Sequence, residues 1–106
     1  MRKELESILY SFKKELSVIY KDKLSDIILF GSQAREEAQE GSDIDILIVL
    51  REEIEPVKEI RKISDIITSL SLEFNEVISC VFVSEKKYKT EQSPLLKNVR
   101  REGISI

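Results

Sequence analysis

The chain has 106 residues, a formal net charge of −3, one cysteine and no histidine. The absence of histidine excludes Ser-His-Asp and Cys-His catalysis, and a single cysteine excludes an internal disulfide and the usual zinc sites. The acidic balance argues against a surface that binds nucleic acid by neutralising its phosphates. Because no apolar run is long enough to span a bilayer and no signal peptide is recognisable, we expect a cytoplasmic protein that forms one domain over residues 1–106.

The first half of the chain predicts one helix and two strands. Apolar residues repeat at helical spacing over residues 2–21, which indicates an amphipathic helix that covers one face of a sheet. Hydrophobic runs at residues 26–30 and 44–50 predict two strands. The excursion between these strands is short, so we expect them to pair in an antiparallel arrangement.

The second half predicts a crossover from one strand to the next. Glu55-Pro56 is typical of a helix start, and an apolar stripe continues from there to Phe74. A strand–helix–strand connection of this length places the next strand, residues 77–84, parallel to the strand at residues 44–50 and beside it. Within that strand, Cys80 is expected to be an inert thiol of the core.

The end of the chain completes the predicted fold. Ser93-Pro94 begins a last helix, which Gly103 ends, and residues 104–106 form a candidate edge strand. The expected fold class is therefore α/β (α+β), with a mixed β-sheet and helices packed mainly on one face. This arrangement leaves the other face open near the polar residues that separate the first two strands.

Gly31 and Ser32 directly follow the first predicted strand. Glycine lets the backbone turn sharply and approach a ligand closely, and Ser32 is expected to cap a short helix that runs to Arg35. The unpaired N–H groups of such a turn and the serine hydroxyl suit a phosphate oxygen, so we interpret the turn as a triphosphate site. Arg35 either contacts phosphate or forms an ion pair that holds the loop, and the second role is favoured.

Asp43 and Asp45 form an acidic pair at the start of the second strand. Residues two apart in a strand point to the same face about 6.6 Å apart, so both carboxylates can share one site. Carboxylate oxygens together with substrate phosphates suit Mg²⁺, and we predict one or two such ions here. A Gly-Ser pair alone is commonly only a turn, and an acidic pair alone is commonly a solvated edge, but their combination favours a functional site.

The runs Phe30-Gly-Ser-Gln-Ala-Arg35 and Gly41-Ser-Asp-Ile-Asp-Ile-Leu-Ile-Val-Leu50 resemble the signature of the DNA-polymerase-beta-type nucleotidyltransferase superfamily, in its minimal MNT form. The resemblance implies that the Gly-Ser turn holds nucleotide phosphates and that the Asp-x-Asp pair binds Mg²⁺. It further implies that an NMP group, here AMP from ATP, passes to an acceptor hydroxyl with release of pyrophosphate.

The same resemblance suggests a partner. Many minimal members resemble the antitoxin of a two-gene system whose all-helical HEPN toxin receives AMP, so a HEPN-type protein is the expected partner. Self-association to a homo-oligomer is the alternative. We expect docking around the open sheet edge and residues 95–106.

A third metal-binding carboxylate, which active family members carry on the adjacent strand, is missing from the expected place. The predicted register puts Ser79 there. Glu76 just before the strand can reach in, and Glu36 and Glu37 of the short helix are alternative donors whose simplest interpretation is a solvated face. Two other functions therefore stay open. One is a catalytically weak or inactive nucleotide-binding module that masks a partner, and the other is a small-molecule nucleotidyltransferase of the aminoglycoside-modifying kind.

Overall fold

The computed structural model describes residues 1–39 and 41–106. Four strands form one sheet in the order β3-β2-β1-β4. Strand β2 pairs antiparallel with β1 and parallel with β3, and β4 pairs antiparallel with β1. The predicted mixed sheet, with its third strand parallel to the second, is therefore confirmed. The strand bounds are Leu24–Phe30 for β1, Ile44–Leu50 for β2, Ile78–Ser84 for β3 and Ile104–Ser105 for β4.

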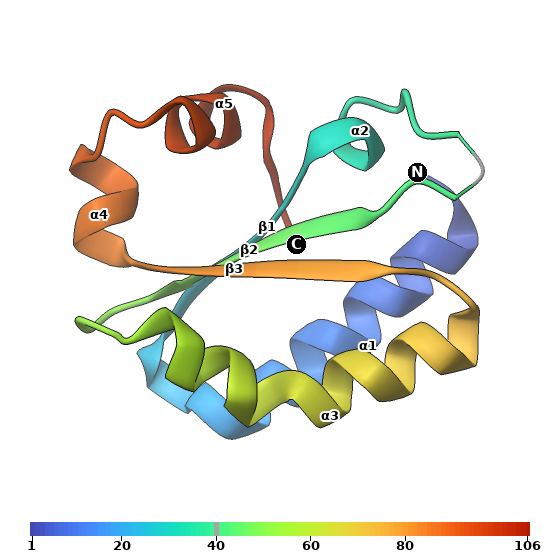
Figure 1. The fold of residues 1–106 in the computed structure, drawn as a ribbon, viewed down its shortest axis with the longest axis horizontal. Coiled ribbons are helices and arrows are strands. Elements are labelled where there is room, and N and C mark those ends of the chain that lie inside the picture. The colour runs from blue at the N-terminus through green and yellow to red at the C-terminus, as the bar shows by residue number, and fades with distance from the viewer. Residues whose placement is uncertain (40) are drawn as a thin grey trace.

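Two long helices cover one face of the sheet (Figure 1). These are α1 (Lys3–Tyr20), which a single 3₁₀ turn (Lys21–Lys23) connects to β1, and α3 (Pro56–Phe74), which begins with proline in its first turn as predicted. Their apolar stripes bury the helix-facing side chains of the strands in one core. The fully buried side chains of this core include Phe12, Leu16, Ile46, Ile48 and Ile63.

No helix in the part of the chain that the structure describes is long and apolar enough to cross a membrane.

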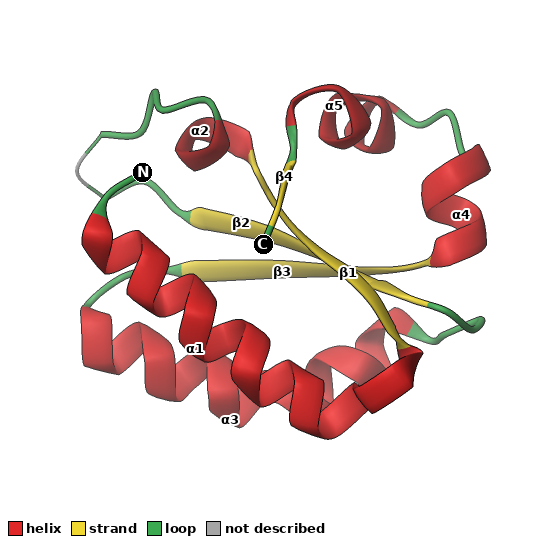
Figure 2. Cartoon of the chain, turned by 180° about the vertical axis from the view of Figure 1, so that it is seen from behind, coloured by secondary structure: helices red, strands yellow, loops and turns green. Residues whose placement is uncertain are grey.

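Three short helices lie on the opposite side of the sheet (Figure 2). They are α2 (Gly31–Ala34), α4 (Glu85–Thr90) and α5 (Pro94–Glu102). Helix α5 packs Leu96 and Val99 into a second apolar cluster with strand residues. The prediction that helices lie mainly on one face holds for the two long helices, while α5 covers part of the second face.

The alternation of side chains along β2 decides which residues reach that second face. Ile44 and Ile46 belong to the core under α1 and α3, whereas Leu47 belongs to the cluster under α5. Asp45 therefore points to the side of the sheet that carries α2 and α5. In the parallel register Asp45 lies opposite Ser79 of β3, so the two side chains share this face as the sequence predicts.

Candidate active site

The turn after β1 and the Asp-x-Asp pair are in direct contact. Phe30 pairs with Asp45 across β1 and β2, and Gly31 then turns the chain with a φ of +74°. The Cα of Gly31 lies against the Asp45 carboxylate, so a Cβ at position 31 would overlap Oδ2 and stand 3.3 Å from Cγ. Only a residue without a side chain fits here without strain. The two sequence motifs therefore form one candidate site.

The capping role predicted for Ser32 is wrong. Helix α2 begins at Gly31, its N-cap residue is Phe30, and no side-chain capping bond is present. Because Gly31 is already the first helical residue, Ser32 lies two positions after the N-cap position and cannot act as the cap. Backbone bonds close the turn instead, from the Arg35 N–H to the Gly31 carbonyl at 3.2 Å and from the Glu37 N–H to the Ser32 carbonyl at 2.9 Å.

The two aspartates lie close enough to influence each other's charge. Asp43 is exposed just before β2, and Asp45 is partly buried in the strand. Burial raises the pKa of Asp45, the negative charge of Asp43 raises it further, and the guanidinium of Arg35 lowers it. A bound cation would relieve the repulsion between these two carboxylates.

The donor set fits Mg²⁺ that shares its coordination with substrate phosphates. Mg²⁺ usually takes one or two carboxylates together with phosphate oxygens and waters rather than an all-protein cage. Asp43 and Asp45 supply two carboxylates, and among residues 1–39 and 41–106 no group of three His, Cys, Asp or Glu side chains is placed to hold a metal. The described residues thus suit a metal that arrives with a nucleotide.

Arg35 connects α2 to the C-terminal end of α5. Its Nε lies 3.0 Å from the Glu37 carboxylate, and one of its terminal nitrogens lies 3.2 Å from the Glu102 carboxylate. Hydrogen bonds to Glu37 and then to Glu102 raise the pKa of Arg35, and the hydrogen bond from Arg35 lowers the pKa of Glu102. These ion pairs agree with the loop-holding role that the sequence favours, and contact of Arg35 with phosphate stays a prediction.

The two candidate positions for a third ligand occupy different places. Ser79 is exposed on β3 directly opposite Asp45. Glu76 lies in the turn between α3 and β3, where its carboxylate forms an ion pair with the guanidinium of Arg2 at 3.1 Å. The structure therefore places a neutral side chain beside Asp45 and an already paired carboxylate at the end of the sheet. Which of the two completes a metal site stays a prediction.

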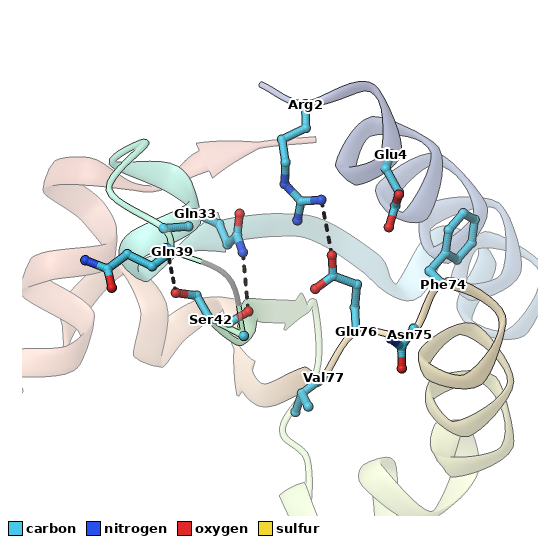
Figure 3. A pocket seen from close by; sticks show the side chains of 11 residues that line it. Arg2, Glu4, Gln33, Gln39, Ser42, Phe74, Asn75, Glu76 and Val77 are labelled. Atoms are coloured by element: carbon cyan, nitrogen blue, oxygen red, sulfur yellow. Dashed lines mark hydrogen bonds and ion pairs between the residues drawn. The ribbon is translucent and has the colours of Figure 1, made fainter.

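A polar pocket of about 520 Å³ is lined in part by Gln33 and Ser42, which neighbour Ser32 and Asp43 in the sequence (Figure 3). Its wall includes Gln33, which is buried, and Ser42, which is held by two bonds. The Gln39 backbone N–H donates to the Ser42 hydroxyl at 2.9 Å, and the Gln33 side-chain amide donates to the Ser42 carbonyl at 3.4 Å. Sequence reasoning missed Arg2 and Gln33 as lining residues. Gln33 stands inside the recognised motif, whereas nothing in the sequence distinguishes Arg2 from other basic residues at a helix start.

Comparison with known proteins supports the interpretation of the Gly-Ser and Asp-x-Asp motifs. The family model described as "Nucleotidyltransferase domain" matches residues 9–103. A relative from Methanocaldococcus jannaschii, named "Putative protein adenylyltransferase MJ0141", is 37% identical over 103 residues, which are 97% of this chain and 99% of the relative.

Solved structures share the fold at lower identity. A crystal structure of a toxin-antitoxin with AMP-PNP superposes with a TM-score of 0.64 at 20% identity and covers 91% of this chain and 69% of that chain. A structure of tri-AMPylated Shewanella oneidensis HEPN toxin in complex with MNT antitoxin gives a TM-score of 0.50 at 18% identity, over 92% and 70% of the two chains. The family match and the near-complete relative confirm the resemblance carried by the motifs: this chain is a nucleotidyltransferase and belongs to the nucleotidyltransferase domain family.

Proposed function

We propose that this chain transfers AMP from ATP to a hydroxyl group of a partner protein, in a reaction that depends on Mg²⁺ at Asp43 and Asp45. The contact between Gly31 and the Asp45 carboxylate carries the proposal. It brings a backbone turn suited to phosphate into the same site as a carboxylate pair suited to a hard cation. A nucleotide that bridges the two motifs would lie on the sheet face that α1 and α3 leave open.

Each residue of the site has a distinct task in this proposal. Gly31 keeps the turn free of side-chain atoms, so that phosphate oxygens reach the backbone N–H groups, and the Ser32 hydroxyl donates one further hydrogen bond. Asp43 and Asp45 would hold the metal, which supplies charge neutralisation at the phosphates and stabilises the attacking and leaving oxygens. Arg35 adds positive charge beside the acidic pair, because its field already lowers the pKa of Asp45.

The transfer exchanges one bond to phosphorus for another. The acceptor oxygen forms a bond to the α-phosphorus, the bond to the bridging oxygen breaks, and pyrophosphate leaves with that oxygen. The acceptor hydroxyl also loses its proton, which passes to water, because the neutral Ser79 opposite Asp45 is a poor base for it. We therefore expect slow transfer by the isolated chain and faster transfer once a partner or Glu76 completes the site.

The names of similar proteins support a protein as the acceptor of AMP. The M. jannaschii relative is named for protein adenylyl transfer, and one structural neighbour is an MNT antitoxin in complex with an AMPylated HEPN toxin. A helical HEPN-type partner is therefore the acceptor we propose, with a second copy of this chain as the alternative. The neutral Ser79 favours one competing function, a nucleotide-binding module that masks its partner without modifying it.

A binding titration run beside a modification assay separates these functions. The chain is titrated with an ATP analogue in Mg²⁺ and in EDTA, and a helical protein encoded beside it is incubated with the chain, ATP and Mg²⁺ before intact-mass analysis. We expect nucleotide affinity only in Mg²⁺ and a partner that gains the mass of AMP. Mg²⁺-dependent binding to an unmodified partner would favour the masking module. A parallel incubation contains an aminoglycoside instead of the partner, and AMP on the aminoglycoside and not on the protein would favour the small-molecule enzyme.

A further inference from the structure

Arg35 and Glu102 form an ion pair that joins the turn after β1 to the end of the last helix. Arg35 is the C-cap residue of α2, and Glu102 is the last residue of α5. Figures 1 and 2 both show these two helices on the same side of the sheet. The two residues are 67 positions apart in the sequence, so the fold and not a local motif brings them together. The candidate site therefore contacts an element that lies outside the Gly-Ser and Asp-x-Asp motifs.

Close packing fixes the segment that carries Glu102. A Cβ added at Gly103 would lie 2.5 Å from the side chain of Ile28 on β1, although the backbone of Gly103 has an ordinary φ of −70°. The next residue, Ile104, pairs with Leu29 of the same strand. The end of α5 is thus held against β1 close to the turn into which β1 leads. Glu102 consequently has a defined position relative to that turn.

The guanidinium of Arg35 is held at two of its three nitrogens. Its Nε donates to the Glu37 carboxylate at 3.0 Å, and its Nη1 donates to the Glu102 carboxylate at 3.2 Å. Within residues 1–39 and 41–106, Nη2 makes no hydrogen bond. The side chain of Glu102 is 23% exposed and that of Glu37 is 66% exposed, so Glu102 is the more confined of the two anchors.

The held guanidinium lies close to the acidic pair. Its positive charge lowers the pKa of Asp45, and its hydrogen bond lowers the pKa of Glu102. Because Glu102 occupies Nη1, it does not block the remaining donor nitrogen of Arg35. A long side chain that is already ordered loses less conformational entropy on meeting an anionic ligand than a mobile one does. The ion pair thus favours binding without competing for the whole guanidinium.

We propose that Glu102 is a positioning residue of the site, which holds the guanidinium of Arg35 beside the turn and the acidic pair before a nucleotide binds. The inference rests on the proposed function, in which Arg35 adds positive charge at that place. Glu102 touches neither the nucleotide nor the metal and acts only through Arg35. The end of α5, with Gly103 and β4 behind it, is therefore part of the structural support of the site.

A double-mutant cycle on nucleotide affinity tests this role. A non-hydrolysable ATP analogue is titrated by calorimetry in Mg²⁺ against the wild-type chain, Glu102→Gln, Arg35→Gln and the double variant. Glu102→Asp keeps the charge on a shorter side chain, and it replaces Glu102→Gln in the cycle should that variant not fold. Arg101→Gln is the matched control, because it removes the other ion-pair partner of Glu102. Circular dichroism gives the melting temperature of each variant.

We expect Glu102→Gln to weaken the ATP analogue about three- to tenfold, which corresponds to ordering one long side chain on binding. Glu102→Asp should recover part of this loss, and Arg101→Gln should change the affinity by less than about twofold. In the Arg35→Gln background, Glu102→Gln should cause no further loss, because no guanidinium is left to hold. The melting temperature of Glu102→Gln should fall by no more than about 5 °C, since ion pairs with this much solvent access contribute little to stability.

Three results would overturn the inference. One is a Glu102→Gln variant that binds the analogue as tightly as the wild type or more tightly, which would make Glu102 a bystander or a competitor of the nucleotide. Another is an equal loss in the wild-type and Arg35→Gln backgrounds, which would mean that Glu102 acts without Arg35. The third is an equal loss in Arg101→Gln, which would assign the effect to surface charge.

The same titrations separate this inference from the proposed function. In all three cases the wild-type chain still binds the analogue with Mg²⁺, so the proposed function survives. A wild-type chain that binds no ATP analogue in Mg²⁺ contradicts both proposals.

Discussion

The Cα of Gly31 lies against the carboxylate of Asp45, in a position that leaves no room for a Cβ. Through this contact, the turn that ends β1 touches the strand that carries the acidic pair. A nucleotide phosphate at the turn and a cation at the carboxylates would consequently be immediate neighbours. The geometry of the site therefore depends on one glycine that has both a left-handed backbone and a close neighbour.

Replacing this glycine should damage the site in a way that strain alone does not. Gly31→Ala and Gly41→Ala both place a side chain on a left-handed backbone, at φ of +74° and +86°, which costs roughly 1–2 kcal/mol of stability in each case. Among the described residues, apart from the chain neighbours, no atom lies within 4 Å of a Cβ added at position 41, whereas a Cβ at position 31 meets Asp45. We expect only Gly31→Ala to weaken Mg²⁺-dependent ATP binding, by about tenfold or more, as measured by calorimetry. Equal binding losses in the two variants would contradict this.

The Asp45 carboxylate is expected to lower the folding stability of the chain at neutral pH and to be needed for Mg²⁺-dependent nucleotide binding. Its pKa is raised by burial and by Asp43, so the folded chain holds this proton more tightly than the unfolded chain does. Stability is therefore lost as the pH rises from the unfolded-state pKa of the carboxyl through its folded-state value. Asp45→Asn should raise the melting temperature at neutral pH, with a gain that shrinks in acid, and should abolish Mg²⁺-dependent nucleotide binding. A variant that is less stable than the wild type at neutral pH would contradict the direction of the shift.

Much of this site follows from sequence patterns, because the alternation of a buried strand fixes which side chains share a face. The apolar runs around Asp45 and Ser79 predict both strands and their register, and the structure pairs these two residues. Tertiary contacts explain the rest. The ion pair of Arg2 with Glu76 joins distant elements, and nothing local encodes it. Helix α4 has only six residues and no apolar periodicity, so its capping by Ser84 becomes evident only in the structure.

Ser79 should limit catalysis if the missing carboxylate matters. The side chain lies opposite Asp45 and is exposed, so an aspartate there would add a third negative charge to the candidate metal site. We expect Ser79→Asp to raise Mg²⁺ affinity or turnover by about three- to tenfold, while the similarly sized but neutral Ser79→Asn does neither. Measuring initial rates over a range of Mg²⁺ concentrations checks both variants. If neither changes and Glu76→Gln abolishes transfer, Glu76 is the third ligand.

Cys80 should be inert in the folded chain. It packs against the core under α1 and α3, and burial raises the pKa of its thiol to about 12. Only the thiolate reacts, so alkylation at pH 8 should be slow in native buffer and fast in urea. The native rate should rise about tenfold for each unit of pH, because the thiolate fraction rises by that factor below the pKa. Rapid labelling of the native chain at pH 8 would show that the thiol is accessible and ionised.

The fate of the two ends of ATP tests AMP transfer to a partner most directly. The chain and a helical protein encoded beside it are incubated with Mg²⁺ and ATP labelled either on the α-phosphate or on the γ-phosphate, with Asp45→Asn as the control. We expect label from the α-phosphate on a hydroxyl of the partner, label from the γ-phosphate in released pyrophosphate, and neither with Asp45→Asn. Label from the γ-phosphate on the partner, or label from the α-phosphate that persists in Asp45→Asn, would contradict the proposed function.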